Sequence, residues 1–153
     1  MNTMQAEPIT HEHAALLEHL GELVTIAREL PRLTTAERAD RRDRAAAFLE
    51  DVLLPHAKAE EHGLYQRVAC VLGHPEATAP MVYDHLAVRE WTARLAETDP
   101  VDVDRLQELL YGLHALIVEH FRKEEELYEP LLDRPEPDEE PFMYEAPALR
   151  HEP

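Results

Sequence analysis

Two short segments of the chain place a histidine and a glutamate four residues apart. The first, HAKAEEHGLY, pairs His56 with Glu60, and the second, HFRKEEELY, pairs His120 with Glu124. Residues four apart lie on the same face of an α-helix. An imidazole and a carboxylate are ligands that divalent transition metals accept. Each segment therefore predicts half of a metal site, provided that it is helical and that other segments supply the remaining ligands.

Four amphipathic segments are expected to position these residues. They are residues 10–30, 35–72, 79–97 and 101–132. Each carries apolar residues at steps of three and four, which is the periodicity of a helix with one buried face. Thr34 can cap the second helix and Gly73 ends it. Pro55 lies inside the second segment and predicts a kink just before His56.

The composition favours the same all-α fold class. The chain of 153 residues has only four glycines, and alanine, leucine, glutamate and arginine dominate it. Four such helices with short connections predict an antiparallel up-down-up-down four-helix bundle over residues 9–132. Residues 1–8 are expected to form a flexible leader. Residues 133–153 are acidic and rich in proline, which predicts a disordered or loosely packed tail.

Charge and hydropathy exclude several classes of partner. The formal net charge of −17 argues against nucleic acid and anionic lipid surfaces. No stretch of about 18 apolar residues could span a membrane, and the N-terminus has no secretory signal. The single cysteine, Cys70, cannot form an internal disulfide. These features predict a cytoplasmic protein that is a monomer or a weak homo-oligomer.

Six polar residues occupy positions of the apolar stripes where a core residue is expected. They are His13, His56, Glu60, His85, His120 and Glu124. Burying two carboxylates costs several kcal/mol unless they are paired or bound to a metal. No buried lysine or arginine is evident as a partner. The four histidines also lie at similar distances from the turns that join their helices, so all six residues are predicted to meet at one level and bind metal.

Other polar residues near the stripes are assigned weaker roles. His11, His19 and His62 are expected at the surface, and Arg89 is expected in solvent. His114 is a candidate for contact with the site from outside it. Glu61, Glu125 and Glu126 are expected to face water or to set the local charge. Tyr65 and Tyr128 are expected to pack in the core.

The order of these ligands resembles the hemerythrin-like family of cation-binding (HHE) domains. The pattern is His13, His56-x-x-x-Glu60, His85 and His120-x-x-x-Glu124. The sequence segments around these ligands are also similar to those of the family, over about residues 9–132. They are EHAALLEHL, PHAKAEEHGLY, MVYDHLAVREW and HFRKEEELYEPLL. The resemblance implies a non-haem di-iron centre inside a four-helix bundle. Glu60 and Glu124 would bridge two irons, one held by His13 and His56 and the other by His85 and His120. Zinc or manganese would also suit these ligands.

The pattern departs from that of the oxygen carriers of this family in two places. The carriers have a further histidine where this chain has Arg89, and they end on a histidine and an aspartate five apart. Here Glu124 follows His120 by four. Fewer protein ligands leave positions open to dioxygen, nitric oxide or peroxide. This favours binding or sensing of such a small ligand.

Three other functions remain open at this point. A di-iron oxidoreductase could turn over peroxide or a small organic substrate, and would need a wider pocket for the organic substrate. Iron storage is disfavoured, because ferritin-like bundles use Glu-x-x-His motifs with more carboxylates. A metal-free bundle could bind a partner through its acidic tail.

Overall fold

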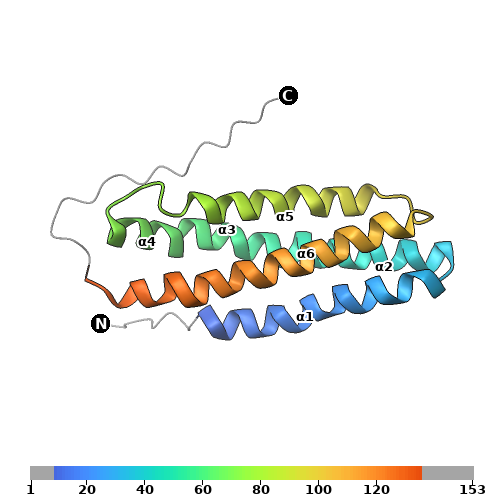
Figure 1. Cartoon of the computed structure of the whole chain (residues 1–153), viewed down its shortest axis with the longest axis horizontal. Coiled ribbons are helices and arrows are strands. Elements are labelled where there is room, and N and C mark those ends of the chain that lie inside the picture. The colour runs from blue at the N-terminus through green and yellow to red at the C-terminus, as the bar shows by residue number, and fades with distance from the viewer. Residues whose placement is uncertain (1–8, 136–153) are drawn as a thin grey trace, which may run out of the picture.

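The computed structural model of the chain describes residues 9–135, and this part is helical throughout, without strands (Figure 1). Its helices are α1 (Ile9–Glu29), α2 (Thr35–Phe48), α3 (Leu54–His62), α4 (Leu64–Leu72), α5 (Ala79–Glu97) and α6 (Val103–Lys123). Short irregular helices occupy Leu30–Arg32, Leu49–Leu53, Glu124–Tyr128 and Glu129–Asp133. The predicted all-α class is confirmed. The predicted leader and nearly all of the predicted tail lie outside the described residues.

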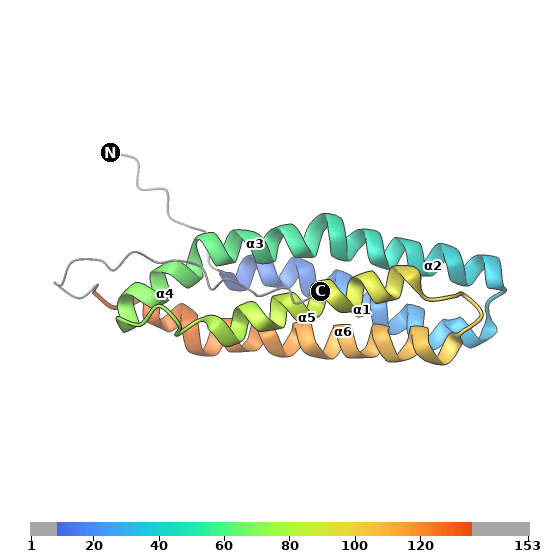
Figure 2. The ribbon, with the colours of Figure 1, turned by 90° about the horizontal axis from the view of Figure 1, so that it is seen from above.

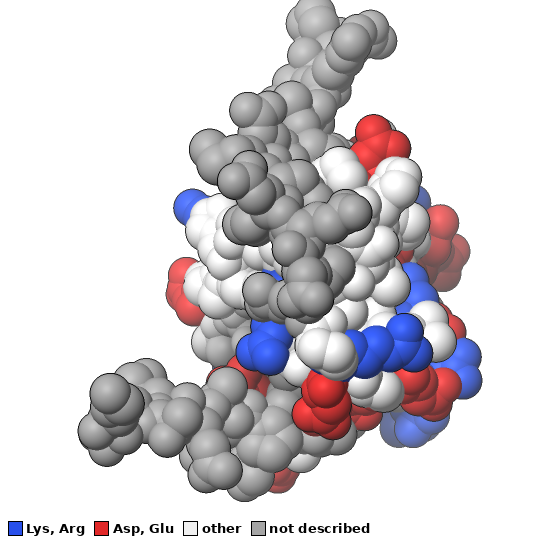
Figure 3. All heavy atoms as spheres, turned by 90° about the vertical axis from the view of Figure 1, so that its left-hand side faces the viewer, with Lys and Arg blue, Asp and Glu red and all other residues white. Residues whose placement is uncertain are grey.

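The helices lie side by side along one long axis (Figures 1 and 2). α2, α3 and α4 follow one another as a single bent rod beside α5. α6 packs against both α1 and α5. Charged side chains of both signs lie on the visible described part of the end where α4 and the end of α6 meet (Figure 3). None of the helices in residues 9–135 is long and apolar enough to cross a lipid bilayer.

Two apolar clusters form the core. The larger cluster fills most of the bundle and includes Leu20, Leu23, Leu30, Leu49, Leu95, Leu106, Leu110, Leu113 and Ile117. The smaller cluster consists of Tyr65, Met81 and Val82. On α5 and on the rod of α2 to α4, the predicted site residues lie between the segments that supply the two clusters. The site is therefore a polar layer with apolar packing on both sides.

The second helical segment is interrupted at two places near the site. A π-helical turn covers Leu49–Leu53, and the N–H of Leu54 bonds to the carbonyl of Leu49, five residues back. This turn directly precedes Pro55, which has no N–H to donate. The predicted kink is thus present, but it begins before the proline. A second break, which the sequence did not predict, occurs at Gly63, where φ is −122° and ψ is −84°.

The last helical segment differs from the expected single helix over 101–132. α6 begins at Val103, after the Asp102 side chain accepts a hydrogen bond from the N–H of Arg105. After Lys123 the chain enters a second π turn, which again precedes a proline, Pro130. A π turn changes the direction of the side chains that follow it. Leu127, which lies within this turn, is 59% exposed.

Candidate metal centre

The structure brings all six predicted site residues together in the polar layer. Five are buried: His13, Glu60, His85, His120 and Glu124. The sixth, His56, has a side chain that is 17% exposed. Below, His13 and His56 are called the α1/α3 pair, and His85 and His120 the α5/α6 pair. The four histidines therefore lie at one level of the bundle.

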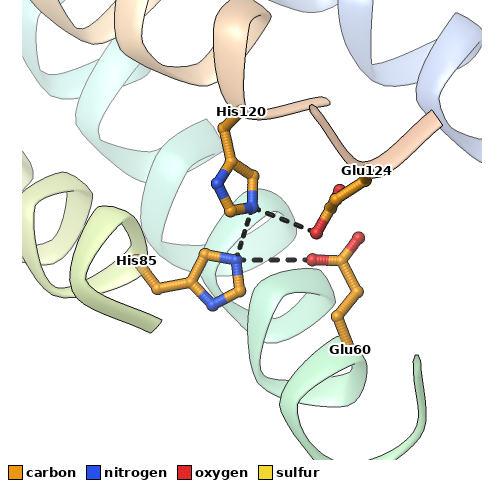
Figure 4. Close-up of side chains that lie close together, drawn as sticks. All are labelled: Glu60, His85, His120 and Glu124. Carbon is orange, nitrogen blue, oxygen red and sulfur yellow. Dashed lines mark hydrogen bonds and ion pairs between the residues drawn. The ribbon is translucent and has the colours of Figure 1, made fainter. Parts of the chain in front are cut away.

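Glu60 contacts histidines of both pairs. Its Oε1 lies 2.7 Å from Nε2 of His56 and 3.3 Å from Nε2 of His13. Its Oε2 lies 3.4 Å from Nε2 of His85 (Figure 4). The two oxygens of one carboxylate thus face different histidine pairs.

Glu124 has the same arrangement from the opposite side of the layer. Its Oε1 lies 3.1 Å from Nε2 of His120 (Figure 4). Its Oε2 lies 3.3 Å from Nε2 of His13. Glu124 is fully buried and is the first residue of the π turn that follows α6. Both glutamates therefore span the space between the α1/α3 and α5/α6 pairs.

The donor atoms are spaced as the ligands of one ion are spaced. Nε2 of His85 and Nε2 of His120 lie 2.9 Å apart (Figure 4). Two atoms that are each about 2.1 Å from one cation, at angles between a right angle and the tetrahedral angle, lie about 3.0 to 3.4 Å apart. The α5/α6 pair and the two glutamates offer four donor atoms within 4.8 Å of one another. The α1/α3 pair and Glu60 form a second such group.

Three buried polar atoms of the site make no hydrogen bond of acceptable geometry within the described residues, although each lies within 3.4 Å of a polar atom of another site residue. They are Nε2 of His56, Oε2 of Glu60 and Oε2 of Glu124. Buried polar atoms are nearly always satisfied in folded proteins, so three on adjacent residues require an explanation. All three carry lone pairs and point into the layer. A cation held among them would use these lone pairs, and the residues present therefore fit a metal site.

The electrostatics of the layer also favour a bound cation. Burial disfavours protonation of His13, but hydrogen bonds with Glu124 and Glu60 outweigh it and raise its pKa to about 10. Burial is likewise outweighed at His120, where hydrogen bonds with Asp84 and Glu124 raise the pKa to about 9. Burial would raise the pKa of both glutamates, yet hydrogen bonds from the histidines lower it. Protons on the imidazoles balance the carboxylate charges, and a divalent cation bound by the same atoms would replace them.

The comparisons with known proteins agree with this geometry. The sequence matches the Hemerythrin HHE cation binding domain over residues 5–132. The chain belongs to the hemerythrin HHE family. No curated protein and no solved structure matches the chain. The family and the His/Glu cluster together indicate that this domain binds metal.

Three acidic residues contact the hemerythrin-family centre in ways that the sequence did not predict. Glu61 and Glu125, expected to face water or to set local charge, accept hydrogen bonds from ring nitrogens of site histidines. Asp84 does the same and carries no distinguishing motif. The available signal is that each is the sequence neighbour of a site residue. Which way such a neighbour points depends on how the helices are rotated against one another.

Tyr65 also enters the hemerythrin-family centre, although only core packing was predicted for it. It is fully buried in the smaller apolar cluster, which confirms the packing. Its hydroxyl lies 3.0 Å from Nε2 of His120 and 3.2 Å from Nε2 of His85, and it donates a hydrogen bond to Glu124. Burial, together with the nearby carboxylates, raises its pKa well above the ordinary value. On a regular helix a residue five positions after Glu60 would point about 140° away from it, and the break at Gly63 changes that direction.

The remaining candidates lie away from the centre. Arg89 is exposed, as predicted, and His62 is exposed at the end of α3. His19 is exposed and stacks on Phe48, with ring centroids 5.4 Å apart. His114 is half-buried on α6 and belongs to neither group of metal-binding donors. The side chain of His11 lies outside the described residues.

A small cavity borders the hemerythrin-family centre on the side of the larger apolar cluster. Its volume is about 10 Å³, which is room for about one water-sized molecule. Its walls are Leu53, His56, Ala57, Glu60, His85, Val88, Ile117, His120 and Phe121. The cavity thus lies against three of the four histidines and Glu60, and its other walls are apolar.

Proposed function

We propose that this domain holds two iron ions bridged by Glu60 and Glu124 and that it binds or senses a small ligand there. The α1/α3 pair would hold one ion and the α5/α6 pair the other. One observation carries the proposal, namely that each glutamate directs one oxygen at each histidine pair. A carboxylate with one oxygen at each pair is placed to bridge two ions.

The size of the cavity supports a ligand of very few atoms. A volume of about 10 Å³ suits dioxygen, nitric oxide or peroxide far better than an organic substrate. Bound iron would supply the electrons and the open coordination positions on which such ligands bind. Val88, Ile117 and Phe121 give the cavity apolar walls beside the metal-binding side chains.

The proposal is tested by anaerobic reconstitution with ferrous iron followed by exposure to air or nitric oxide. We expect close to two iron ions per chain by elemental analysis and charge-transfer absorption after exposure. A featureless spectrum from iron-loaded protein would contradict ligand binding. Iron uptake far above two per chain would indicate storage instead.

Turnover of peroxide is a second candidate, and the position of Tyr65 favours it. The Tyr65 hydroxyl donates to Glu124 and lies beside both histidines of the α5/α6 pair. It is thus placed to donate a hydrogen bond within the layer. We expect steady consumption of hydrogen peroxide with a reductant, and loss of this activity in His120→Ala. Turnover that survives in His120→Ala would exclude the centre as its source.

A further inference from the structure

The site histidines present their two ring nitrogens to different surroundings. Nε2 of each one faces a glutamate within the layer. Nδ1 faces outward, and for three of them it meets a carboxylate at hydrogen-bond distance. Nδ1 of His13 lies 3.0 Å from Glu125, Nδ1 of His85 lies 2.8 Å from Glu61, and Nδ1 of His120 lies 3.0 Å from Asp84.

These outer carboxylates form a ring around the centre that is open at one place. Glu61, next to Glu60 on α3, bonds to His85 on α5. Asp84, next to His85, bonds to His120 on α6. Glu125, next to Glu124 beyond α6, bonds to His13 on α1. Glu12, next to His13, lies 3.7 Å from Nδ1 of His56 on α3, too far for a hydrogen bond. Three of these four carboxylates therefore support a histidine of the next helix, and the ring is open between Glu12 and His56.

The chemistry of this arrangement is specific. A carboxylate that accepts a hydrogen bond from Nδ1–H leaves the lone pair of Nε2 directed inward, and makes the imidazole a stronger electron donor. Glu61, Asp84 and Glu125 are only 20–28% exposed, so their charges are incompletely screened by water. Negative charge this close favours the more positive of two oxidation states of a bound ion.

We propose that Glu61, Asp84 and Glu125 are positioning residues that orient the histidine ligands and lower the reduction potential of the bound iron. This inference rests on the proposed iron centre. Glu12 is 56% exposed and too distant from His56, so it contributes least. The ring thus acts on the α5/α6 pair through two carboxylates and on the α1/α3 pair chiefly through Glu125.

Lys123 modifies one member of the ring. Its ammonium group donates to Oδ2 of Asp84, the same oxygen that accepts from His120. Among the ion pairs within residues 9–135, Glu61 and Glu125 contact only histidines. The positive charge of Lys123 therefore weakens the effect of Asp84 alone. Removing this charge would lower the potential further, which is the opposite of removing a carboxylate.

The test compares the midpoint potentials of iron-loaded wild type, Glu125→Gln, Glu61→Gln, Asp84→Asn and Lys123→Gln by spectroelectrochemical titration. Glutamine and asparagine keep an oxygen that accepts from Nδ1–H but lose the charge. We expect Glu125→Gln and Glu61→Gln to favour the reduced state about tenfold, which is about 59 mV for one electron. Asp84→Asn is expected to shift the potential less, and Lys123→Gln in the opposite direction.

Glu126→Gln is the matched control. It makes the same charge change one residue from Glu125, but its side chain is 63% exposed and lies 4.0 Å from Arg122 rather than against a histidine. Variants whose potentials equal that of Glu126→Gln would overturn this inference alone. Failure of the wild type to bind iron would overturn the proposed function and this inference with it. If Glu125→Gln does not fold, Lys123→Gln still tests the inference. An unchanged or raised reduction potential in Lys123→Gln would contradict the proposed effect of the ring carboxylates.

Discussion

The two histidine pairs come from segments of nearly the same pattern but have different surroundings. In the α5/α6 pair both rings are at most 5% exposed, their Nε2 atoms are 2.9 Å apart, and the Tyr65 hydroxyl lies beside them. In the α1/α3 pair the ring centroids are 5.5 Å apart, and the two ring planes meet at an angle of 75°. His13 stacks on Phe121 at 3.9 Å, while His56 is 17% exposed. One half is closed and polar, and the other is partly open.

This difference shows that a repeated motif does not give the two histidine pairs the same surroundings. The spacing His-x-x-x-Glu places the same donors at each position, whereas solvent access and hydrogen-bonding partners come from neighbouring helices. We therefore expect the ion of the α1/α3 pair to exchange with solvent more readily than the ion of the α5/α6 pair. Four predictions test this comparison.

The largest effect is expected from removing a glutamate that both halves share. Glu60→Ala and Glu124→Ala should each lose both ions, because each carboxylate contacts both histidine pairs. Elemental analysis of reconstituted protein measures this directly. Glu126→Ala, which removes an exposed carboxylate, should keep both ions. Retention of one full equivalent in Glu60→Ala would show that the carboxylate serves one half only.

Removing one histidine should separate the halves. His120→Ala should weaken the ion of the α5/α6 pair by more than about 100-fold, beyond the range usual for residues that only support a ligand. His56→Ala should weaken mainly the other ion, and by less, because water can replace the partly exposed His56 ring. Stepwise metal titration resolves the two affinities. Equal losses from both ions in either variant would contradict the division into two halves.

The metal-free protein should lose stability in mildly alkaline solution. The folded-state pKa of His13 is raised to about 10 and that of His120 to about 9, from an ordinary value of 6.5. A raised pKa adds stability that is complete below pH 6.5 and disappears as the pH rises through the folded-state pKa. The free energy of unfolding in urea should therefore fall between pH 6.5 and 10, on the order of a few kcal/mol.

Metal-loaded protein provides the control for this pH dependence. The ions replace the imidazole protons, so its stability should change little over the same range. His120→Ala should abolish the part of the loss near pH 9 and retain the part near pH 10, which belongs to the α1/α3 pair. A metal-free protein whose stability is flat from pH 6.5 to 10 would show that these histidines are not protonated in the fold.

The smallest effect is expected from Tyr65→Phe. This change removes one hydroxyl from the α5/α6 half and keeps the buried ring in the smaller apolar cluster. We expect no more than about a tenfold change in affinity, consistent with the loss of a single hydrogen bond. Only the ion of the α5/α6 pair should respond. A comparable change in the other ion would mean that the two halves are less separate than the distances indicate.

The sequence alone determined the helical class and the six residues of the centre. Both follow from the 3.6-residue period of the helix, which is a local property: it shows that His13 and His85 stand where leucine is expected. The presence of two near-identical His-x-x-x-Glu segments then predicted which residues share a face. These statements need no knowledge of how one helix is rotated against another.

Only the tertiary structure decided what surrounds those six residues. Glu61, Asp84 and Glu125 bond to histidines on other helices, and Tyr65 reaches across to Glu124. The directions of Glu61, Glu125 and Tyr65 depend on the π turns before Pro55 and Pro130 and on the break at Gly63. Asp84 lies on the uninterrupted helix α5, so its direction depends on how that helix is rotated against α6. Such interruptions change the helical phase by amounts that a regular period cannot express. The sequence pattern thus identified the inner residues of the centre, and helix packing set the contacts that distinguish its two halves.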